Sequence, residues 1–337
     1  MNVIWFWVLT AMLAAYAILD GYDLGVGTLH VWLARTNEER RTLLNAIGPV
    51  WNGNEVWLIA AGGMMLPSFP RVYAAGFSGF YLALMVVLWL LILRGVSIEF
   101  RGQIDNRLWR ALWDSGFGFG SSLLALLLGV ALGNVVRGLP VGAAGYFQGT
   151  FALLLNPYSL LTGVLSWAIL AWHGANYLRT KTEGSLLHKA RKWSDRLFWF
   201  AAVLIVLATA ATFAVRPSSG TTYRQHPLAF AFPLLTIAGL AAGYFCSARG
   251  RNKGAFRSST ATIAGLIGSA AASVYPNLLI STANPSYSLT IYNAASSPLA
   301  LRASLFANLA GMLAVIVYST YVHRTFRGKV RLSDHGY

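Results

Sequence analysis

The first long apolar run of the chain, at 3–33, contains the stretch Leu19-Asp20-Gly21-Tyr22-Asp23-Leu24-Gly25. The second run, at 48–67, contains Glu55. A carboxylate at the depth of a lipid bilayer costs roughly 2.5–3.5 kcal/mol on insertion scales, so a chain with three of them in neighbouring apolar runs must gain something from them. These acids are the first indication of where the function lies.

The composition is that of an integral membrane protein. The chain has 337 residues, of which 56% are hydrophobic and only 11% charged, and its mean hydropathy is +0.55. Soluble domains carry about 25% charged residues, whereas apolar runs of about 20 residues span a hydrocarbon core of roughly 30 Å as helices. We therefore predict an all-α integral membrane fold, a single polytopic membrane domain over 1–337, with nine transmembrane helices near 3–33, 48–67, 72–93, 111–134, 159–178, 197–215, 228–247, 259–281 and 301–322.

The basic residues predict the orientation of these helices, because Lys and Arg accumulate in short cytoplasmic loops. With the N-terminus outside and the C-terminus inside, 21 of the 26 Lys and Arg residues fall on the cytoplasmic side. The longest cytoplasmic loops are then expected at 94–110, 179–196 and 248–258. The longest outer loops are expected at 135–158 and 282–300.

The net charge of +15 belongs to this topology and to anionic lipid headgroups, so we expect membrane lipid, and no nucleic acid, as a partner. The single cysteine, Cys246, excludes a disulfide within the chain. The sequence contains no P-loop, HExxH or GxGxxG motif, so no soluble-enzyme motif competes with this interpretation, and we expect no metal site.

The polar residues of the first run share one face of a helix. Successive steps of four, three and seven residues, which follow the helical repeat, separate Tyr16, Asp20, Asp23 and His30. Gly21 and Gly25 form a separate GxxxG-like pair, which predicts a close contact with another helix.

The acids lie at similar depths in consecutive helices. At a rise of about 1.5 Å per residue, Asp23 lies roughly 15 Å and Glu55 roughly 12 Å from the predicted cytoplasmic ends of their helices, and Asp114 is shallower on the same side. Buried carboxylates with water, Asn, Tyr and His partners suit a proton-conducting path that is open to the cytoplasm. The candidates for such a path are Asp20, Asp23, His30, Asn52, Asn54, Glu55 and Asp114.

The same residues suit other roles. One or two of the acids could instead pair with arginine or cap broken backbone, and a cation site of a transporter is a third possibility. His30 and His173 are potential haem ligands, but both lie near cytoplasmic helix ends, which favours a hydrogen-bonding role. Trp51 and Trp57 flank the acidic part of the second helix and are candidates to line a pocket.

Two motifs in the first two runs are unusually specific. They are Asp20-Gly21-Tyr22-Asp23-Leu24-Gly25-Val26-Gly27 and Gly48-Pro49-Val50-Trp51-Asn52-Gly53-Asn54-Glu55-Val56-Trp57-Leu58. Both resemble subunit II of cytochrome bd-type quinol oxidases. Further matches at 73–81, 132–138, 156–163, 173–178 and 326–330 extend the resemblance over all nine predicted helices.

The resemblance implies a respiratory complex of a bacterial plasma membrane, in which quinol is oxidised and dioxygen is reduced to water with protons taken from the cytoplasm. It implies a partner subunit I with two b-type haems and one d-type haem. Subunit II then ligates no haem and is built of two four-helix bundles plus one peripheral helix. A small single-span third subunit, and a structural quinone or lipid, are further partners that the resemblance allows.

The resemblance also assigns roles by position. Asp23 matches an acid on the proton route proposed for the family. Trp57 matches a tryptophan near the proposed oxygen or quinone contacts, so Trp51 and Trp57 become candidates for that contact.

The chain departs from the family motif at one place. Many relatives carry Asp in a Trp-Asp-Gly-Asn-Gln motif, where this chain has Asn52, and Glu55 stands in place of the Gln. The carboxylate is thereby displaced by three residues, about one helical turn along the same face. We predict that Glu55 takes over the role of the missing acid.

The sequence thus favours the non-haem subunit of a quinol oxidase, which contributes a scaffold and a cytoplasmic path for protons and is a candidate route for oxygen. From a different class, the alternative is a secondary transporter with a cation or proton site at Asp20, Asp23 and Glu55. A purely scaffolding subunit is the third hypothesis.

Overall fold

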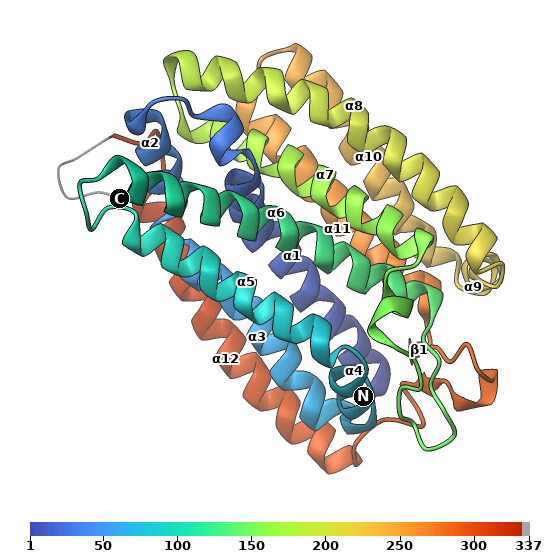
Figure 1. The fold of residues 1–337 in the computed structure, drawn as a ribbon. Helices are drawn as coiled ribbons and strands as arrows, with labels where there is room; N and C mark the ends of the chain where they lie inside the picture. Colours follow the sequence, from blue (N-terminus) through green and yellow to red (C-terminus); the bar gives the residue numbers. More distant parts are fainter. Residues whose placement is uncertain (332–337) are drawn as a thin grey trace.

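The structure is a computed structural model that describes residues 1–331, so the end of the predicted domain 1–337 lies outside the described residues. Long helices run side by side in one elongated bundle (Figure 1). Within the described residues, the strands are the short antiparallel pair β1 (Asn277–Leu279) and β2 (Leu289–Thr290). The prediction of an all-α fold is therefore confirmed in its main feature.

Nine helices of the described part have 18 or more residues. They are α1 (Asn2–Leu33), α3 (Trp51–Ser68), α5 (Tyr81–Phe100), α6 (Arg107–Arg137), α7 (Pro157–Lys181), α8 (Gly184–Val215), α10 (Ala231–Ala248), α11 (Asn252–Val274) and α12 (Pro298–Thr325). Shorter helical segments between them are α2 (Asn37–Ile47), α4 (Pro70–Gly79), η1 (Phe151–Leu154), α9 (Ser219–Gln225), η2 (Pro227–Phe230) and η3 (Pro285–Tyr287). Each predicted apolar run overlaps one of the long helices, although the ends differ.

Six helical segments among residues 1–331 are both long and apolar enough to cross a membrane, namely α1, α5, α6, α8, η2 with α10, and α12. They confirm a multi-pass membrane protein. The helices α3, α7 and α11 are more polar, and α7 in particular packs against α1, α6, α8 and α11. A helix enclosed by other helices needs no apolar surface for lipid, so the number of nine spans stays a prediction.

The predicted helix 72–93 differs most from the structure. The chain forms two helices, α4 and α5, separated at Phe80, and α5 continues to Phe100. The prediction ends the helix at Arg94 because a charge commonly marks a membrane boundary. Arg94 lies instead inside α5 with no exposed surface, so the expected loop 94–110 is wrong in its first half.

The predicted helix 259–281 is wrong at its C-terminal end. The helix α11 stops at Val274, before Pro276. A proline offers no N–H to a helix and disfavours helical backbone in the preceding residue. Tyr275 accordingly leaves the helical region, at φ −52° and ψ 139°.

The segments predicted as outer loops cover one end of the bundle together. Leu139 of the segment after α6 forms a β-bridge with Ser281 of the segment after α11. Figure 1 shows β1 and its neighbouring loops at the end where α4 also lies. The two segments predicted as outer loops therefore lie at the same end of the bundle.

The segments rich in Lys and Arg lie at the opposite end, near α2 in Figure 1. The ammonium of Lys329 donates to the carbonyl of Thr182 at 2.7 Å, and Lys189 pairs with Glu39 of α2 at 2.5 Å. The predicted loop 179–196 is nevertheless mostly helical, because α8 begins already at Gly184.

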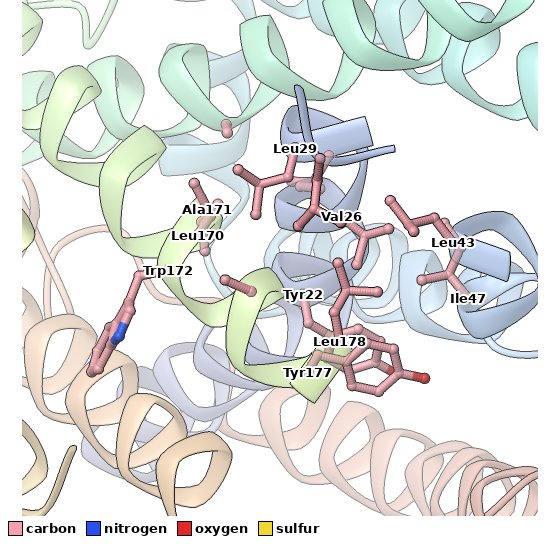
Figure 2. Packing of buried hydrophobic residues seen from close by; sticks show 14 of the residues in the cluster. Tyr22, Val26, Leu29, Leu43, Ile47, Leu170, Ala171, Trp172, Tyr177 and Leu178 are labelled. Atoms are coloured by element: carbon pink, nitrogen blue, oxygen red, sulfur yellow. The ribbon is translucent and has the colours of Figure 1, made fainter. Parts of the chain in front are cut away.

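The helix α1 crosses α7 in direct backbone contact. A Cβ atom on Gly25 would lie 2.0 Å from the carbonyl oxygen of Leu170, and one on Gly174 would lie 2.4 Å from the carbonyl carbon of Gly25. The contact predicted from the GxxxG-like pair is therefore present. Figure 2 shows the side chains that pack around this crossing, among them Tyr22, Val26, Leu170, Ala171, Tyr177 and Leu178.

Replacing Gly174 by alanine should destabilise the protein. Overpacking costs about 1–3 kcal/mol in well-packed interiors, and here the clash is with backbone that cannot rotate away. Melting of the purified complex should occur at a clearly lower temperature for Gly174→Ala. The matched control is Gly21→Ala at the same crossing, where the added methyl meets only the end of the Leu170 side chain at 2.8 Å. Equal losses in the two variants would contradict this account of the crossing.

Candidate functional site

Arg94 joins three helices through two acids. Its guanidinium donates from Nη1 to Oδ2 of Asp20 at 2.9 Å and from Nη2 to Oδ1 of Asp20 at 2.5 Å. Glu55 of α3 lies on the same guanidinium, with Oε1 at 3.1 Å from Nη1. Arg94 and Asp20 have no exposed side-chain surface, whereas Glu55 is 21% exposed. We call Asp20, Glu55 and Arg94 the Arg94 cluster.

Arg94 is not among the site residues predicted from the sequence, because the predicted helix 72–93 ends before it and leaves it in the expected loop 94–110. A signal for its burial was nevertheless present. The residues Gly95-Val96-Ser97-Ile98 continue the apolar character of the run for another turn. When a charged residue is followed by a further apolar turn, the helix is expected to continue past it. The charged side chain then faces a polar group of another helix.

Asp23 takes part in a different set of contacts. Its Oδ2 accepts a hydrogen bond from Nδ2 of Asn54 at 2.7 Å, and the same nitrogen lies 2.8 Å from the hydroxyl of Tyr22. That hydroxyl in turn lies 2.9 Å from Nε2 of His323, on α12. We call these four residues the His323 chain. Asp23 and Asn54 are buried, and Oδ1 of Asp23 has no hydrogen-bond partner among the described residues.

The hydrogen bonds assign the state of the His323 ring. Its Nδ1 lies 2.8 Å from the carbonyl oxygen of Ser319, which can only accept, so Nδ1 carries a hydrogen. In the neutral ring Nε2 is then the acceptor, and the Tyr22 hydroxyl donates to it. Protonation of Nε2 would reverse that hydrogen bond. The Tyr22 hydroxyl thus lies between the ring of His323 and the amide of Asn54.

Asp114 forms a second ionic group, nearer the basic end of the bundle. Its Oδ1 accepts from Nε of Arg101 at 2.6 Å and lies 2.6 Å from Nε2 of His30, and its Oδ2 accepts from Nη1 of Arg40 at 2.7 Å. We call these four residues the Asp114 cluster. The structure separates Asp114 and His30 from the other candidates, since two arginines hold this carboxylate.

The contact expected between Asp23 and Glu55 takes another form. No hydrogen bond or ion pair joins these two side chains within residues 1–331. Asp23 is bound by Asn54, and Glu55 is bound by Arg94. They remain adjacent because Asn54 and Glu55 are consecutive in α3. The Arg94 cluster and the His323 chain are therefore neighbours.

The remaining candidates of α3 lie near the Arg94 cluster and the His323 chain. Asn52 is exposed, while Trp51 is buried and packs against α5, where a Cβ on Gly95 would lie 3.2 Å from its ring. Trp57 is half-buried against the cluster of apolar side chains at the β1 end of the bundle. The two tryptophans thus flank the acidic segment but contact different parts of the core.

The two buried histidines do not fit haem ligation. Nδ1 of His173 lies 2.7 Å from the Ser259 hydroxyl, Nε2 lies 3.0 Å from the carbonyl of Ile18, and the ring stacks on Phe256. Nε2 of His30 is bound to Asp114, and its ring is buried against neighbouring side chains. Their hydrogen-bonding role agrees with the prediction. Within residues 1–331, no group of three or more His, Cys, Asp or Glu is arranged to hold a metal ion.

Comparison with known proteins gives the family. The model of the family "Cytochrome bd terminal oxidase subunit II" matches residues 1–326. The chain belongs to this family. It is 34% identical to the probable cytochrome oxidase subunit 2 of Haemophilus influenzae, over 98% of this chain and 95% of the relative. It is 31% identical to the cytochrome bd-I ubiquinol oxidase subunit 2 of Escherichia coli K12, over 99% and 96%. It is 32% identical to the cytochrome bd ubiquinol oxidase subunit 2 of Bacillus subtilis, over 97% and 96%.

A solved structure supports the fold. A chain of the bd oxidase structure from Geobacillus thermodenitrificans matches with a TM-score of 0.78 and 21% identity, over 96% of this chain and 98% of that chain. The resemblance stated from the sequence motifs is therefore confirmed. The chain is a subunit II of a bd-type terminal oxidase, and so a component of a haem-dependent oxidoreductase complex of respiratory electron transport. It is a multi-pass inner-membrane protein whose family membership implies a partner subunit I.

Removing the charge of Arg94 should strongly destabilise this subunit II. Breaking a buried ion pair at one partner costs about 3–5 kcal/mol, because the other charge stays buried without compensation. Arg94→Gln should therefore lower the yield and the melting temperature of the assembled complex. The double variant Arg94→Gln/Asp20→Asn should recover part of the loss, since it removes the two fully buried charges and leaves only the partly exposed Glu55 unpaired.

The control for this test is Arg110→Gln, which removes an arginine paired with the exposed Asp105. Exposed pairs contribute little to stability, so this variant should melt like the unmodified protein. If Arg94→Gln melted like Arg110→Gln, the central role of Arg94 would be refuted.

Proposed function

We propose that this subunit II admits protons from the cytoplasm and delivers them toward the haem-bearing subunit I, where quinol is oxidised and dioxygen is reduced to water. Subunit I would carry two b-type haems and one d-type haem. The observation that carries the proposal is the His323 chain, in which His323 of α12 contacts Tyr22 and the amide of Asn54 donates to both Tyr22 and the buried carboxylate of Asp23.

A proton can pass from His323 to Asp23 in balanced steps if one water molecule joins Tyr22 to Asp23. A proton that binds Nε2 of His323 makes this nitrogen a donor to the oxygen of Tyr22. When the proton passes to that oxygen, Tyr22 releases its own proton, which would reach the unpartnered Oδ1 of Asp23 through a water molecule, because the amide of Asn54 donates to both groups and cannot relay a proton. His323 is then neutral again, and Asp23 has gained the proton.

The charges around Arg94 favour a bound proton near Asp23. The guanidinium of Arg94 pairs with two carboxylates, those of Asp20 and Glu55, and a third, that of Asp23, lies one helical turn from Asp20 without a cation of its own among the described residues. A single positive charge cannot neutralise three negative charges, and an uncompensated charge is costly in a buried site. A transferable proton on this group of acids would restore the balance. Two arginines neutralise the carboxylate of Asp114, so this acid needs no bound proton. We assign it a structural role.

We assign Glu55 as the acid that replaces the one missing at Asn52. The two residues lie three positions apart on α3, Asn52 is exposed and Glu55 is partly exposed, so both are accessible from the same face. Glu55 can therefore exchange a proton with a partner surface on one side while it contacts Arg94 on the other. Asn52 itself carries no proton to exchange.

The topology belongs to the same proposal. Nine spans, with the N-terminus outside and the C-terminus inside, place His323 near the cytoplasm. The packing supports two four-helix groups: α1, α3, α5 and α6, and then α7, α8, α10 and α11, with α12 peripheral against α3. In this arrangement, α12 supplies the entry residue of the proton path.

Further partners follow from the family rather than from a contact in this chain. A small single-span third subunit, and a structural quinone or lipid, are compatible with the exposed apolar helix faces. Trp51 and Trp57 stay candidates for oxygen or quinone contact. The alternative of a cation transporter is less well supported, because Arg94 lies between Asp20 and Glu55, where a bound cation would have to lie.

Substitution of the two acids tests the roles assigned to them. Asp23→Asn keeps the size and the acceptor for Asn54 but cannot carry a proton, so oxygen consumption per assembled complex should fall by about 100-fold, the lower end for a positioned proton-transfer group. Glu55→Gln should also impair turnover and cytoplasmic proton uptake in proteoliposomes. Asp105→Asn, an exposed acid, is the control and should behave normally.

The outcomes separate the hypotheses. Normal turnover in Glu55→Gln together with impaired turnover in Asp23→Asn would show that Glu55 does not replace the missing acid. Reduced assembly with normal turnover per assembled complex in both variants would support a purely scaffolding subunit instead.

A second test concerns the entry of the path. His323→Phe and Tyr22→Phe should each slow proton uptake, because each removes one link of the same chain. The double variant should be no slower than the slower single variant. Once one residue of a single path is removed, removing a second residue of the same path has no further effect. Tyr321→Phe, an exposed residue of α12, is the control. Additive losses in the double variant would place His323 and Tyr22 on separate routes.

A further inference from the structure

A cavity of about 550 Å³ opens at the basic end of the bundle, between α7, α10 and α11 and the segment that follows α12. Four cations line it, and no carboxylate does so among the described residues. These cations are Arg179, Arg251, Lys253 and Lys329. The cavity lies outside both ionic clusters and the His323 chain, so it requires an explanation of its own.

Arg179, in the last turn of α7, is buried in the wall of this cavity without a charge partner. It has no exposed surface, and its Nη2 has no hydrogen-bond partner. Its other nitrogens donate only to neutral oxygens, for example Nη1 to the Ser247 hydroxyl at 2.8 Å and Nε to Oδ1 of Asn252 at 3.2 Å. No ion pair within residues 1–331 includes Arg179. A buried guanidinium with an unused donor, facing a cavity, indicates an anionic ligand.

The N-terminus of α11 contributes a second, independent feature. Asn252, Lys253 and Gly254 line the cavity and form the first turn of this 23-residue helix. No side chain caps that end, so the N–H groups of the first turn lack partners from the helix itself. Unpaired N–H groups and the helix dipole together favour phosphate and other anions.

The acids near the cavity, Asp195 and Glu183, offset its positive charge only in part. Asp195 accepts a hydrogen bond from Ser247 at 2.5 Å and is exposed to solvent. Glu183 raises the pKa of Lys329, but burial is the larger effect, and with Arg191 and Lys253 it holds that pKa below its usual value. The groups around Lys329 thus leave an excess of positive charge that an anion would stabilise.

We propose that this cavity binds a phosphate group, held by Arg179, the rim cations Arg251 and Lys253, and the N–H groups of the first turn of α11. The group belongs to the headgroup of an anionic phospholipid or to a water-soluble phosphate. Both share the charge and the acceptor oxygens that the site requires. The site is independent of the proton path.

The test uses the assembled complex in detergent, titrated with fluorescently labelled phosphatidylglycerol and, separately, with inorganic phosphate as competitor. The binding variant is Arg251→Gln/Lys253→Gln, whose side chains are exposed at the rim, and Arg179→Gln is the second variant. The matched control is Arg257→Gln, an exposed arginine of α11 that does not line the cavity.

We expect one saturable site in the unmodified complex and in Arg257→Gln. The dissociation constant should rise about fivefold for each rim charge removed, with oxygen consumption unchanged. Lipid binding that inorganic phosphate does not displace identifies a headgroup site. Displacement at low phosphate concentration identifies a soluble ligand. The proposal would be overturned if neither probe showed a saturable site. It would also be overturned if the rim double variant bound with the same affinity as the unmodified complex. Neither result would bear on proton delivery.

Discussion

The buried ion pair between Arg94 and Asp20 is the constraint on which the arrangement of α1, α3 and α5 depends. Two hydrogen bonds fix the guanidinium against α1, and its contact with Glu55 adds α3. A buried pair of this kind gives little net stability compared with apolar packing, but removing either member leaves a charge that the interior cannot solvate. The pair therefore specifies which helices lie together more than it strengthens them. The backbone contact between Gly25 and Gly174 then places α7 against a different face of α1.

The acids of the apolar helices differ in whether a cation neutralises them. Asp114 is held by Arg40 and Arg101, and Asp20 is held by Arg94. Asp23 is bound by neutral groups, and one of its oxygens has no partner. A carboxylate that no cation neutralises, at the end of a series of hydrogen bonds, is the group best suited to accept and release protons. The proton path proposed for this subunit therefore rests on the partners of each acid rather than on the acids alone.

Much of the fold could be read from the sequence, and the errors share a physical cause. Apolar runs gave the long helices because lipid demands apolar surfaces and internal backbone hydrogen bonds. The ends were misplaced where a polar residue has its partner inside the protein, as at Arg94, or where α8 continues into the basic segment after Lys181. The candidate site was found through the cost of burying Asp20, Asp23 and Glu55. The partners Tyr22, Arg94 and His323 were missed, because no rule of spacing joins α1 to α5 or to α12.

The sequence by itself determined the class of protein, the approximate positions of its long helices, the family and the candidate acids, because each of these follows from local composition or from motifs of consecutive residues. The tertiary structure alone decided which acid is neutralised and which is not. That distinction depends on contacts between residues far apart in the chain, such as Asp20 with Arg94 and Tyr22 with His323. The same is true of the cavity at Arg179, whose unpaired charge becomes visible only when α7, α10 and α11 are packed together.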